Sequence, residues 1–294
     1  MCEVLGVSAS GFYAWQGRTL MRPQVVPATQ LLRMRIRALH AASRGCYGSP
    51  RIHAALRAEG TRVGRNRVIR LMRVDQLRGR PRRRFRMTTV SDPVATHPPN
   101  HLRQRFAAAA PNRVWTADIT ALATAEGWLF VAVLLDLWSR RVVGWAISDH
   151  ADARLVAAAW RMALTSRQPI AGLVHHSDRG AQYTSEAYQS LLRAQGVQCS
   201  MSRPGNCWDN APTESFFRTF KVELGAGPWR TRTDTMHAIA AYFAFYNRDR
   251  LHSSLGYQSP ANFEQHFRDQ CNAEPEHASP SVQTRAGRRR SATM

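Results

Sequence analysis

The chain has 294 residues, 44% of them hydrophobic, and carries a formal net charge of +21. This length suits one large domain and a smaller one, and the charge exceeds what solubility needs, so a polyanionic partner is expected. No apolar stretch is long enough to cross a bilayer, and the first residues lack the pattern of a secretory signal. These features favour nucleic acid over a membrane as the partner, and a cytoplasmic, nucleoid-associated location.

The N-terminal part of the chain is predicted to be helical and basic. Residues 1–27 look like a fragment of an upstream helical unit. Helices are expected over residues 28–43, from Ser49-Pro50 to Gly60, and over residues 65–74. A helix, a short turn with glycine and a basic helix are typical of a helix-turn-helix, which we assign to residues 28–87 with Arg70 and Arg73 as DNA contacts. The alternative is a solvated basic helix without base contacts.

An arginine-rich segment follows the last of these helices. Six arginines occupy nine positions between residues 78 and 86. Like charges at this density cannot pack together, so Arg82, Arg83 and Arg84 are expected to contact phosphates. Residues 88–112 contain four prolines and little periodicity, which indicates a linker.

The remainder of the chain has the pattern of an α/β domain. Three strands expected over residues 113–120, 127–136 and 141–148 are followed by alternating helices and strands. This order predicts a mixed five-stranded sheet with flanking helices over residues 113–267. Residues 268–294 are expected to be a disordered basic tail. The further elements are helices over 152–166, 184–195, 211–224 and 233–249, a last short helix from Ser259-Pro260, and strands over 171–177 and 197–202.

Three acidic residues, each at the edge or end of a predicted element, are the candidate catalytic and metal-binding groups. Asp118 lies in a strand, Asp178 follows a strand, and Glu214 lies in the first turn of a helix. Carboxylates that converge on one point are what a two-metal site for phosphoryl transfer requires, because Mg²⁺ prefers oxygen ligands. Taken alone, each has a simpler explanation: a turn residue for the aspartates and a favourable helix dipole for Glu214.

Several polar residues lie close to these carboxylates in sequence. Arg218 and Lys221 follow Glu214 on the same helix face, where they could bind the DNA backbone, although Arg218 could instead form an ion pair with Glu214. Arg179 and Asn210 are further candidate DNA contacts. No phosphate-binding loop for ATP is present. Three other polar residues are assigned structural roles: Asp136 as the cap of a turn, and His175 and His176 as strand or supporting residues rather than zinc ligands.

These motifs together resemble the retroviral-integrase-like DDE transposases of bacterial insertion sequences. The most similar group is the IS-three family, specifically its larger catalytic protein. The resemblance extends over residues 10–267. It rests on the segments Tyr47-Gly-Ser-Pro-Arg-Ile52, Trp115 to Thr120, His176 to Tyr183, Gly205 to Phe217, and Tyr246 to Pro260.

The resemblance implies an RNase H-like fold with Asp118, Asp178 and Glu214 as its metal-binding triad. It implies two Mg²⁺ ions, for which Mn²⁺ can substitute, and a reaction that cleaves DNA at insertion-sequence ends and transfers the strand. Transposon ends, target DNA and further copies of the chain are the expected partners. The chain departs from the family pattern at two places. The family often has a small residue just before its glutamate motif, where this chain has Pro212-Thr213, and usually leucine before the lysine, where this chain has Phe220. In this family an upstream reading frame supplies another helix-turn-helix, so a separate or fused upstream protein is a further expected partner.

Two other functions fit the same residues. An RNase H-like nuclease would cut DNA with the same triad but would not join strands. A catalytically silent DNA-binding remnant of a transposon would keep the basic regions and would need no Mg²⁺.

Overall fold

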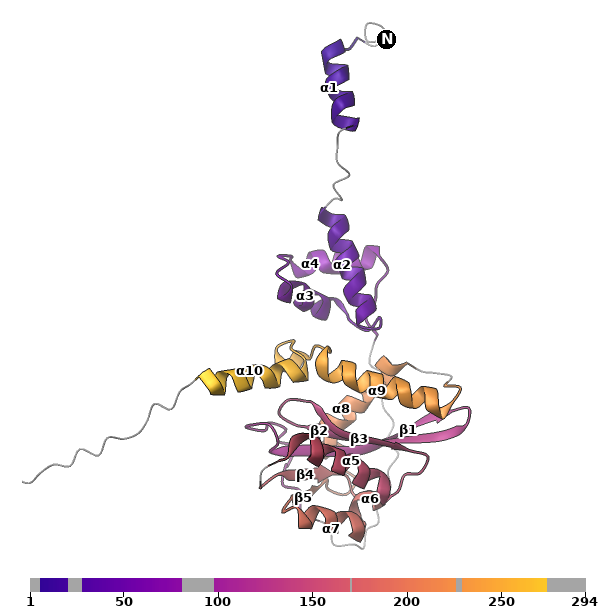
Figure 1. Cartoon of the computed structure of the whole chain (residues 1–294), viewed down its shortest axis with the longest axis vertical. Coiled ribbons are helices and arrows are strands. Elements are labelled where there is room, and N and C mark those ends of the chain that lie inside the picture. Colours follow the sequence, from indigo (N-terminus) through magenta and orange to yellow (C-terminus); the bar gives the residue numbers. More distant parts are fainter. Residues whose placement is uncertain (1–5, 21–27, 81–97, 170, 226–228, 274–294) are drawn as a thin grey trace, which may run out of the picture. The chain divides into compact units, whose positions relative to one another are not determined.

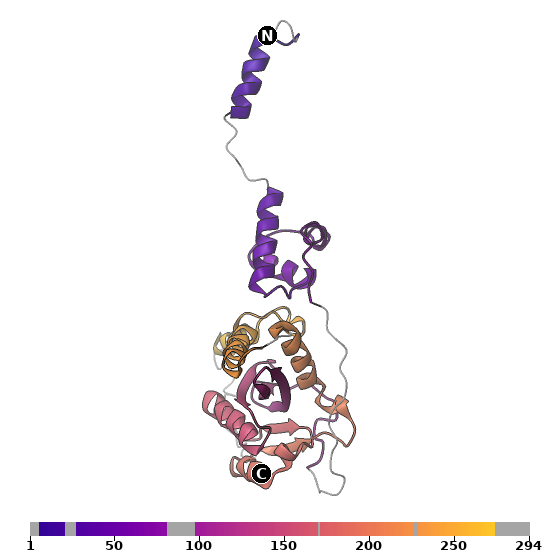
Figure 2. The same ribbon diagram turned by 90° about the vertical axis from the view of Figure 1, so that its right-hand side faces the viewer.

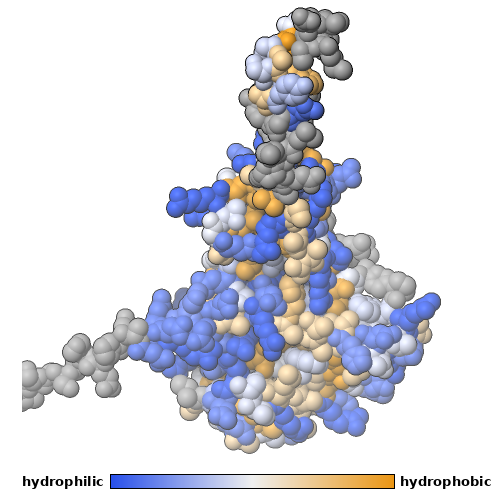
Figure 3. Space-filling model, turned by 45° about the horizontal axis from the view of Figure 1, so that its top comes forward, coloured by the Kyte–Doolittle hydropathy of each residue, from blue (hydrophilic) through white to orange (hydrophobic). Residues whose placement is uncertain are grey.

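The structure is a computed structural model that describes residues 6–20, 28–80, 98–169, 171–225 and 229–273. The chain divides into two compact units (Figure 1). One comprises Met1–Phe85 with Arg218–Ala226, and the other comprises the remaining residues. On the face shown in Figure 3, hydrophilic side chains cover much of the surface of the described residues, in keeping with the high net charge.

The first unit is helical, as predicted. Its helices bury apolar residues at helical spacing, and the side chains of Ile36, Ile52, Leu56 and Val68 are fully buried. Exposed arginines alternate with these buried positions on the last helix. The elements are α1 (Ala9–Leu20), α2 (Ala28–Ala42), α3 (Ser49–Ala58) and α4 (Arg65–Val74).

One buried carboxylate holds two of these helices together. Asp75, which caps the C-terminus of α4, accepts hydrogen bonds from the guanidinium groups of Arg33 and Arg37 on α2. These bonds lower the pKa of Asp75 from its ordinary value of 3.8 to about 2. The guanidinium groups of these two arginines therefore bind a carboxylate within the protein, and this contact distinguishes them from the exposed arginines of α4.

The second unit contains a mixed five-stranded sheet, which confirms the predicted fold. The strands lie in the order β3-β2-β1-β4-β5. The first three form an antiparallel meander, and β4 and β5 continue the sheet in parallel with β1. Their bounds are β1 (Val114–Thr124), β2 (Gly127–Asp136), β3 (Val142–Ser148), β4 (Val174–Ser177) and β5 (Gln198–Met201).

Helices cover the sheet on both faces (Figure 2). On β1, Trp115 and Ala117 face a core formed with α5, whereas Thr116 between them contacts α8. This alternation follows from the two-residue repeat of a strand. The helices are α5 (Ala153–Arg167), α6 (Ala181–Thr184), α7 (Glu186–Ala194), α8 (Ala211–Leu224), α9 (Arg232–Arg248) and α10 (Pro260–Ala273), with short 3₁₀ turns η1 (Cys207–Asn210) and η2 (Ser253–Leu255).

The packing of α5 against the sheet depends on a glycine in β3. A β-carbon at Gly144 would lie 2.7 Å from the β-carbon of Ala163 and against the backbone carbonyl of Ala159. The absence of a side chain therefore lets α5 approach β3 closely. The largest side chains in this core are Trp115 and Trp160, whose rings meet edge to face at 5.5 Å.

Several elements differ in extent from the prediction. Strand β1 continues to Thr124 because it pairs along its whole length with β2. The helix predicted over residues 184–195 is α7, and a short helix that was not predicted, α6, precedes it and is separated from it by the extended backbone of Ser185. Helix α10 continues to Ala273, beyond the predicted end of the core. Within the described ranges, no helix has the length and apolar content of a membrane span.

Candidate active site

Two of the predicted carboxylates lie within two residues of the paired positions of β1 and β4. Strands β1 and β4 are parallel, and Thr116 pairs with His176. The two residues of each pair are 60 positions apart, and Asp118 and Asp178 have the same separation, with Asp178 directly after β4. Residues at even spacing along a strand point to one face, so Asp118 lies on the face of β1 that carries Thr116.

Backbone amides orient both aspartates. The N–H of Ile119 donates to Asp118 Oδ1 at 2.7 Å, and the N–H of Gly180 donates to Asp178 Oδ1 at 3.0 Å. Burial nevertheless raises the pKa of Asp178 above its ordinary value, because the bond from Gly180 only partly offsets the loss of water. This carboxylate is thus in surroundings that favour a compensating positive charge.

The third carboxylate is carried by the first turn of α8, which is fastened to β1. The hydroxyl groups of Thr213 and Thr116 share a hydrogen bond of 2.7 Å. The amide of Asn210 donates to the carbonyl oxygen of Ala117 at 3.1 Å. These contacts hold the residues next to Glu214 against the residues next to Asp118, so the fold brings the helix end and the two strands together.

The loop before α8 is organised by a buried aspartate. Asp209 is fully buried and accepts hydrogen bonds from the backbone and guanidinium of Arg203 and from the side chain of Gln104. These bonds, chiefly the side-chain bond from Arg203, lower the pKa of Asp209 well below its ordinary value. The segment leading to Glu214 is therefore fixed by two adjacent residues, Asp209 and Asn210.

A buried tyrosine hydroxyl is affected by the charges of both aspartates. Tyr183 is buried, and no hydrogen-bond partner is present for its hydroxyl among the described residues. Burial raises the pKa of Tyr183 well above its ordinary value, and the charges of Asp118 and Asp178 raise it further. The phenol therefore lies within electrostatic reach of both carboxylates. Within the described ranges, no three histidine, cysteine, aspartate or glutamate side chains form a preassembled metal cluster.

The two histidines before Asp178 have structural surroundings, as predicted. His175 shares a hydrogen bond of 2.9 Å with the hydroxyl of Tyr188, and His176 shares one of 2.8 Å with Ser200. Burial lowers the pKa of His175 to about 3 and that of His176 to about 4. Both rings are therefore neutral hydrogen-bonding groups within the sheet.

Comparison with known proteins shows the family to which the chain belongs. Residues 108–207 and 195–260 match models described as integrase core domain, and residues 27–85 match an HTH-like domain. The chain is 42% identical over 270 residues to the insertion element IS600 uncharacterized 31 kDa protein of Shigella sonnei, covering 91% of this chain and 98% of that protein. It is 38% identical over 266 residues to the transposase InsF for insertion sequence IS3A of Escherichia coli (strain K12), covering 90% and 92%.

The chain belongs to the IS3 family of insertion-sequence transposases. Its similarity to one chain in the cryo-EM structure of the simian T-cell lymphotropic virus intasome in complex with PP2A regulatory subunit B56 gamma has a TM-score of 0.49 at 15% identity, covering 88% of this chain and 80% of that one. The integrase-core models and the transposase relatives confirm the predicted enzyme class, a DDE transposase or integrase, and the HTH-like match indicates that the transposase binds DNA.

Asp136 has the turn-capping role predicted for it. Its Oδ1 accepts from the backbone of Trp138 and Ser139, and its Oδ2 accepts from the backbone of Asn112. It is fully buried, and its burial raises its pKa. With its oxygens used in this way, Asp136 stabilises the turn between β2 and β3 of the transposase.

The predicted DNA contacts have different surroundings. Arg70, Arg73 and Lys221 are exposed, Arg218 is half-buried on α8, and Arg82, Arg83 and Arg84 lie outside the described residues. Arg179 uses its Nε to bind the carbonyl oxygen of Ser202 at 2.8 Å. Asn210 is buried, and its amide bonds both Ala117 and Thr213. This placement favours a positioning role for Asn210 over the predicted DNA contact.

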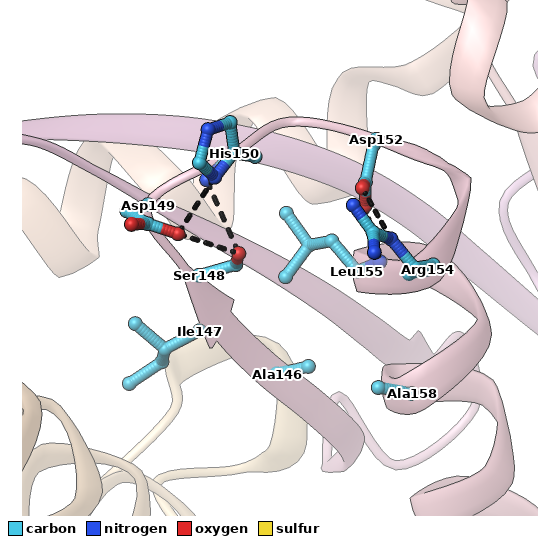
Figure 4. Close-up of a pocket in the computed structure, with 9 residues that line it drawn as sticks. All are labelled: Ala146, Ile147, Ser148, Asp149, His150, Asp152, Arg154, Leu155 and Ala158. Atoms are coloured by element: carbon cyan, nitrogen blue, oxygen red, sulfur yellow. Dashed lines mark hydrogen bonds and ion pairs between the residues drawn. The ribbon is translucent and has the colours of Figure 1, made fainter.

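A separate hollow lies at the end of β3 and the start of α5. Its volume is about 440 Å³, and none of the three candidate carboxylates lines it. Its polar groups are paired with one another: His150 bonds Asp149, and Arg154 bonds Asp152 (Figure 4). Asp152 also caps α5 by accepting from the backbone of Leu155. These pairings explain the polar residues of the hollow as structural groups.

Thr213, Thr116 and Asp209 are positioning residues that the sequence analysis missed. The signal available for them was the presence of polar residues inside a strand and a helix that otherwise bury apolar ones. Such a signal does not identify a partner, because the bonded residues are 97 and 6 positions apart along the chain.

Proposed function

We propose that the transposase cleaves DNA at insertion-sequence ends and joins the freed strand to target DNA, using Asp118, Asp178 and Glu214 to hold two divalent metal ions. The observation that supports this proposal most strongly is that Asp118 and Asp178 both follow the paired positions of β1 and β4 by two residues, while the start of α8 is hydrogen-bonded to β1 beside Asp118. Three carboxylates from separate elements form a set of oxygen donors suited to Mg²⁺, for which Mn²⁺ can substitute.

The surroundings of the aspartates fit a cation. The raised pKa of Asp178 reflects a buried carboxylate that lacks full compensation, and a bound cation would supply it. When bound, divalent ions activate the attacking oxygen and stabilise the leaving oxygen of a phosphodiester. The protein's own contribution is position: Gly180 orients Asp178, and Thr213 and Asn210 hold the turn that carries Glu214.

The basic residues would hold the DNA backbone. Exposed Arg70 and Arg73 on α4 suit contacts in the helical unit, and Lys221 suits a contact beyond Glu214. Arg179 and Arg218 are proposed as further contacts, together with the arginine-rich segment at Arg82, Arg83 and Arg84. Two DNA ends must be brought together for joining, so we propose that several copies act together, with an upstream-frame helix-turn-helix protein as a partner. Binding to chromosomal DNA would place the transposase at the nucleoid.

A strand-joining assay tests this function. The full chain is incubated with Mg²⁺ and labelled duplexes made from the DNA that flanks its gene. Joined products support the transposase. Nicks without joining, unchanged when the upstream-frame protein is added, would instead indicate a nuclease. Binding without any metal-dependent product, again with that protein present, would indicate a silent DNA-binding remnant.

A further inference from the structure

Trp208 is an exposed aromatic residue in the loop that precedes the helix of Glu214. It lies in η1, and 69% of its surface is exposed. Tryptophan is enriched at binding surfaces because its ring has a large apolar face together with a polar N–H group. The contacts described above that hold the candidate metal site do not involve the Trp208 ring, so they do not explain its exposure.

The backbone that carries this ring is held on both sides. The N–H of Trp208 donates to Asn206 Oδ1 at 3.1 Å, and its carbonyl oxygen accepts from the N–H of Ala211. The next residue, Asp209, is buried and holds Arg203 and Gln104. The exposed ring therefore projects from a fixed backbone, which is the arrangement of a preorganised binding surface.

The backbone of Trp208 is also close to the contacts that hold the candidate catalytic carboxylates. Asn210, two residues further on, bonds the carbonyl oxygen of Ala117, which precedes Asp118. Two residues span at most about 7 Å. The α-carbon of Trp208 therefore lies within about 7 Å of the α-carbon of Asn210, which is hydrogen-bonded to the strand of Asp118. A nucleotide beside a phosphate held at the carboxylates is within reach of a side chain placed here.

Cationic side chains accompany the ring. Arg103 and Arg105 are exposed and flank Gln104, whose side chain bonds Asp209. Arg203 in the same loop binds Asp209 through its guanidinium, so the phosphate contacts are assigned to Arg103 and Arg105. An aromatic ring together with arginines is the combination that binds unpaired nucleic acid, since bases stack on the ring and phosphates pair with the cations.

We infer that Trp208 is a stacking platform for an unpaired base of the DNA strand next to the phosphate that reacts. This inference rests on the proposed function, because it places that base beside the proposed metal site. Trp208 would hold a frayed strand end in place, and the stacking would depend little on base identity, since every base has an aromatic face.

A fluorescence binding experiment without divalent metal tests this role. The probe is a duplex whose short unpaired 3′ end carries one 2-aminopurine, a base analogue that loses emission when it stacks; the control probe is the same duplex fully paired. The full chain is compared with Trp208→Phe, Trp208→Leu and Trp208→Ala. Trp128→Ala serves as the matched control, since Trp128 is 58% exposed at the start of β2, away from the carboxylates.

We expect Trp208→Ala and Trp208→Leu to bind the frayed duplex about 5- to 150-fold more weakly, the equivalent of the usual stacking contribution per base. Both should fail to reduce the probe's emission, while Trp208→Phe and Trp128→Ala should reduce it as the parent chain does. The inference is overturned if Trp208→Leu binds the frayed duplex as tightly as Trp128→Ala does. The inference is equally overturned if Trp208→Leu loses affinity for the frayed and the paired duplex alike, since that would indicate a contact to the DNA backbone or within the protein.

Failure of the proposed function gives a different result. Because the binding experiment contains no metal, stacking is measured whether or not the chain cuts DNA. If the parent chain and every variant make no product with Mg²⁺ but differ in emission as expected, the proposed reaction is wrong and the stacking site is right.

Discussion

The hydroxyl groups of Thr116 and Thr213, 97 positions apart in sequence, share a buried hydrogen bond of 2.7 Å between β1 and the first turn of α8. Neither side chain has any exposed surface. This bond joins the strand of Asp118 to the helix of Glu214, so the arrangement of the proposed triad depends on residues that do not themselves bind metal.

We predict that Thr213→Val lowers the free energy of unfolding by about 1–3 kcal/mol, because it leaves the buried hydroxyl of Thr116 without this partner. Adding Thr116→Val should restore part of that loss, since replacing both partners with apolar groups removes the unpaired hydroxyl. Urea unfolding of the two single variants and the double variant measures the coupling. Simply additive losses would show that the two hydroxyls do not interact.

Gly180→Ala should impair DNA cleavage while leaving the fold intact. A β-carbon at position 180 would lie 3.1 Å from Asp178 Oδ1 and 3.0 Å from Gln182 Oε1, so the carboxylate must shift by a few tenths of an ångström. Misplacement of about 1 Å in an active site costs about 100-fold in rate, and we expect a loss of roughly tenfold here.

The control for this prediction is Gly64→Ala. A β-carbon at Gly64 would meet no atom within 4 Å, and its φ of −77° suits alanine. Metal-dependent cleavage rates and thermal melting of both variants make the comparison. Equal cleavage by the two variants would remove the proposed link between Gly180 and the carboxylate.

The sheet could be predicted because its sequence signals are local. Strand β2 was predicted with the bounds it has, since Gly127 begins it after a turn and Asp136 ends it at another. Helix α6 could not be predicted, because its four residues are too few to show a helical period. The extension of β1 to Thr124 depends on pairing with β2 rather than on its own residues.

The proposed site was predictable as a set of carboxylates but not as an arrangement. Asp118 and Asp178 could be placed at strand positions from local pattern, while the parallel pairing of β1 with β4, which brings their strands together, is a property of the sheet. The bonds made by Asn210 could not be predicted either, because burial of an amide depends on what packs over it. Most features of the site that could not be predicted from the sequence therefore depend on long-range contacts.

Asp75→Asn should destabilise the helical unit in a pH-dependent way. The pKa of Asp75 is lowered in the folded protein, chiefly by its hydrogen bond from Arg33 and then by that from Arg37. Its stabilising contribution is therefore present above its ordinary pKa of 3.8 and is lost as the pH falls through about 2.

We expect Asp75→Asn to melt at a lower temperature than the parent chain at neutral pH. The two melting temperatures should converge as the pH falls from about 4 to about 2. Circular dichroism of the full chain over this pH range measures the difference. A gap in melting temperature that persists unchanged to pH 2 would show that the charge of Asp75 is not what stabilises the helices.

DNA binding should weaken steeply with salt, because the arginines displace counterions from phosphates. Arg70→Gln should reduce the slope of log affinity against log salt concentration by about 1, the change expected for the loss of one phosphate contact. Arg154→Gln is the matched control, since Arg154 is exposed but paired with Asp152. A flat salt profile, or equal slopes for the two variants, would argue against phosphate contacts by α4.

The most direct test of the proposed metal site is strand joining by Glu214→Gln, measured beside the parent chain with Mg²⁺ and the upstream-frame protein. The substitution keeps the size of the side chain but removes its negative charge. We predict that it abolishes both cleavage and joining while DNA affinity stays close to that of the parent chain. Joining retained by Glu214→Gln would contradict the assignment of Glu214 as a metal ligand, and with it the proposed triad.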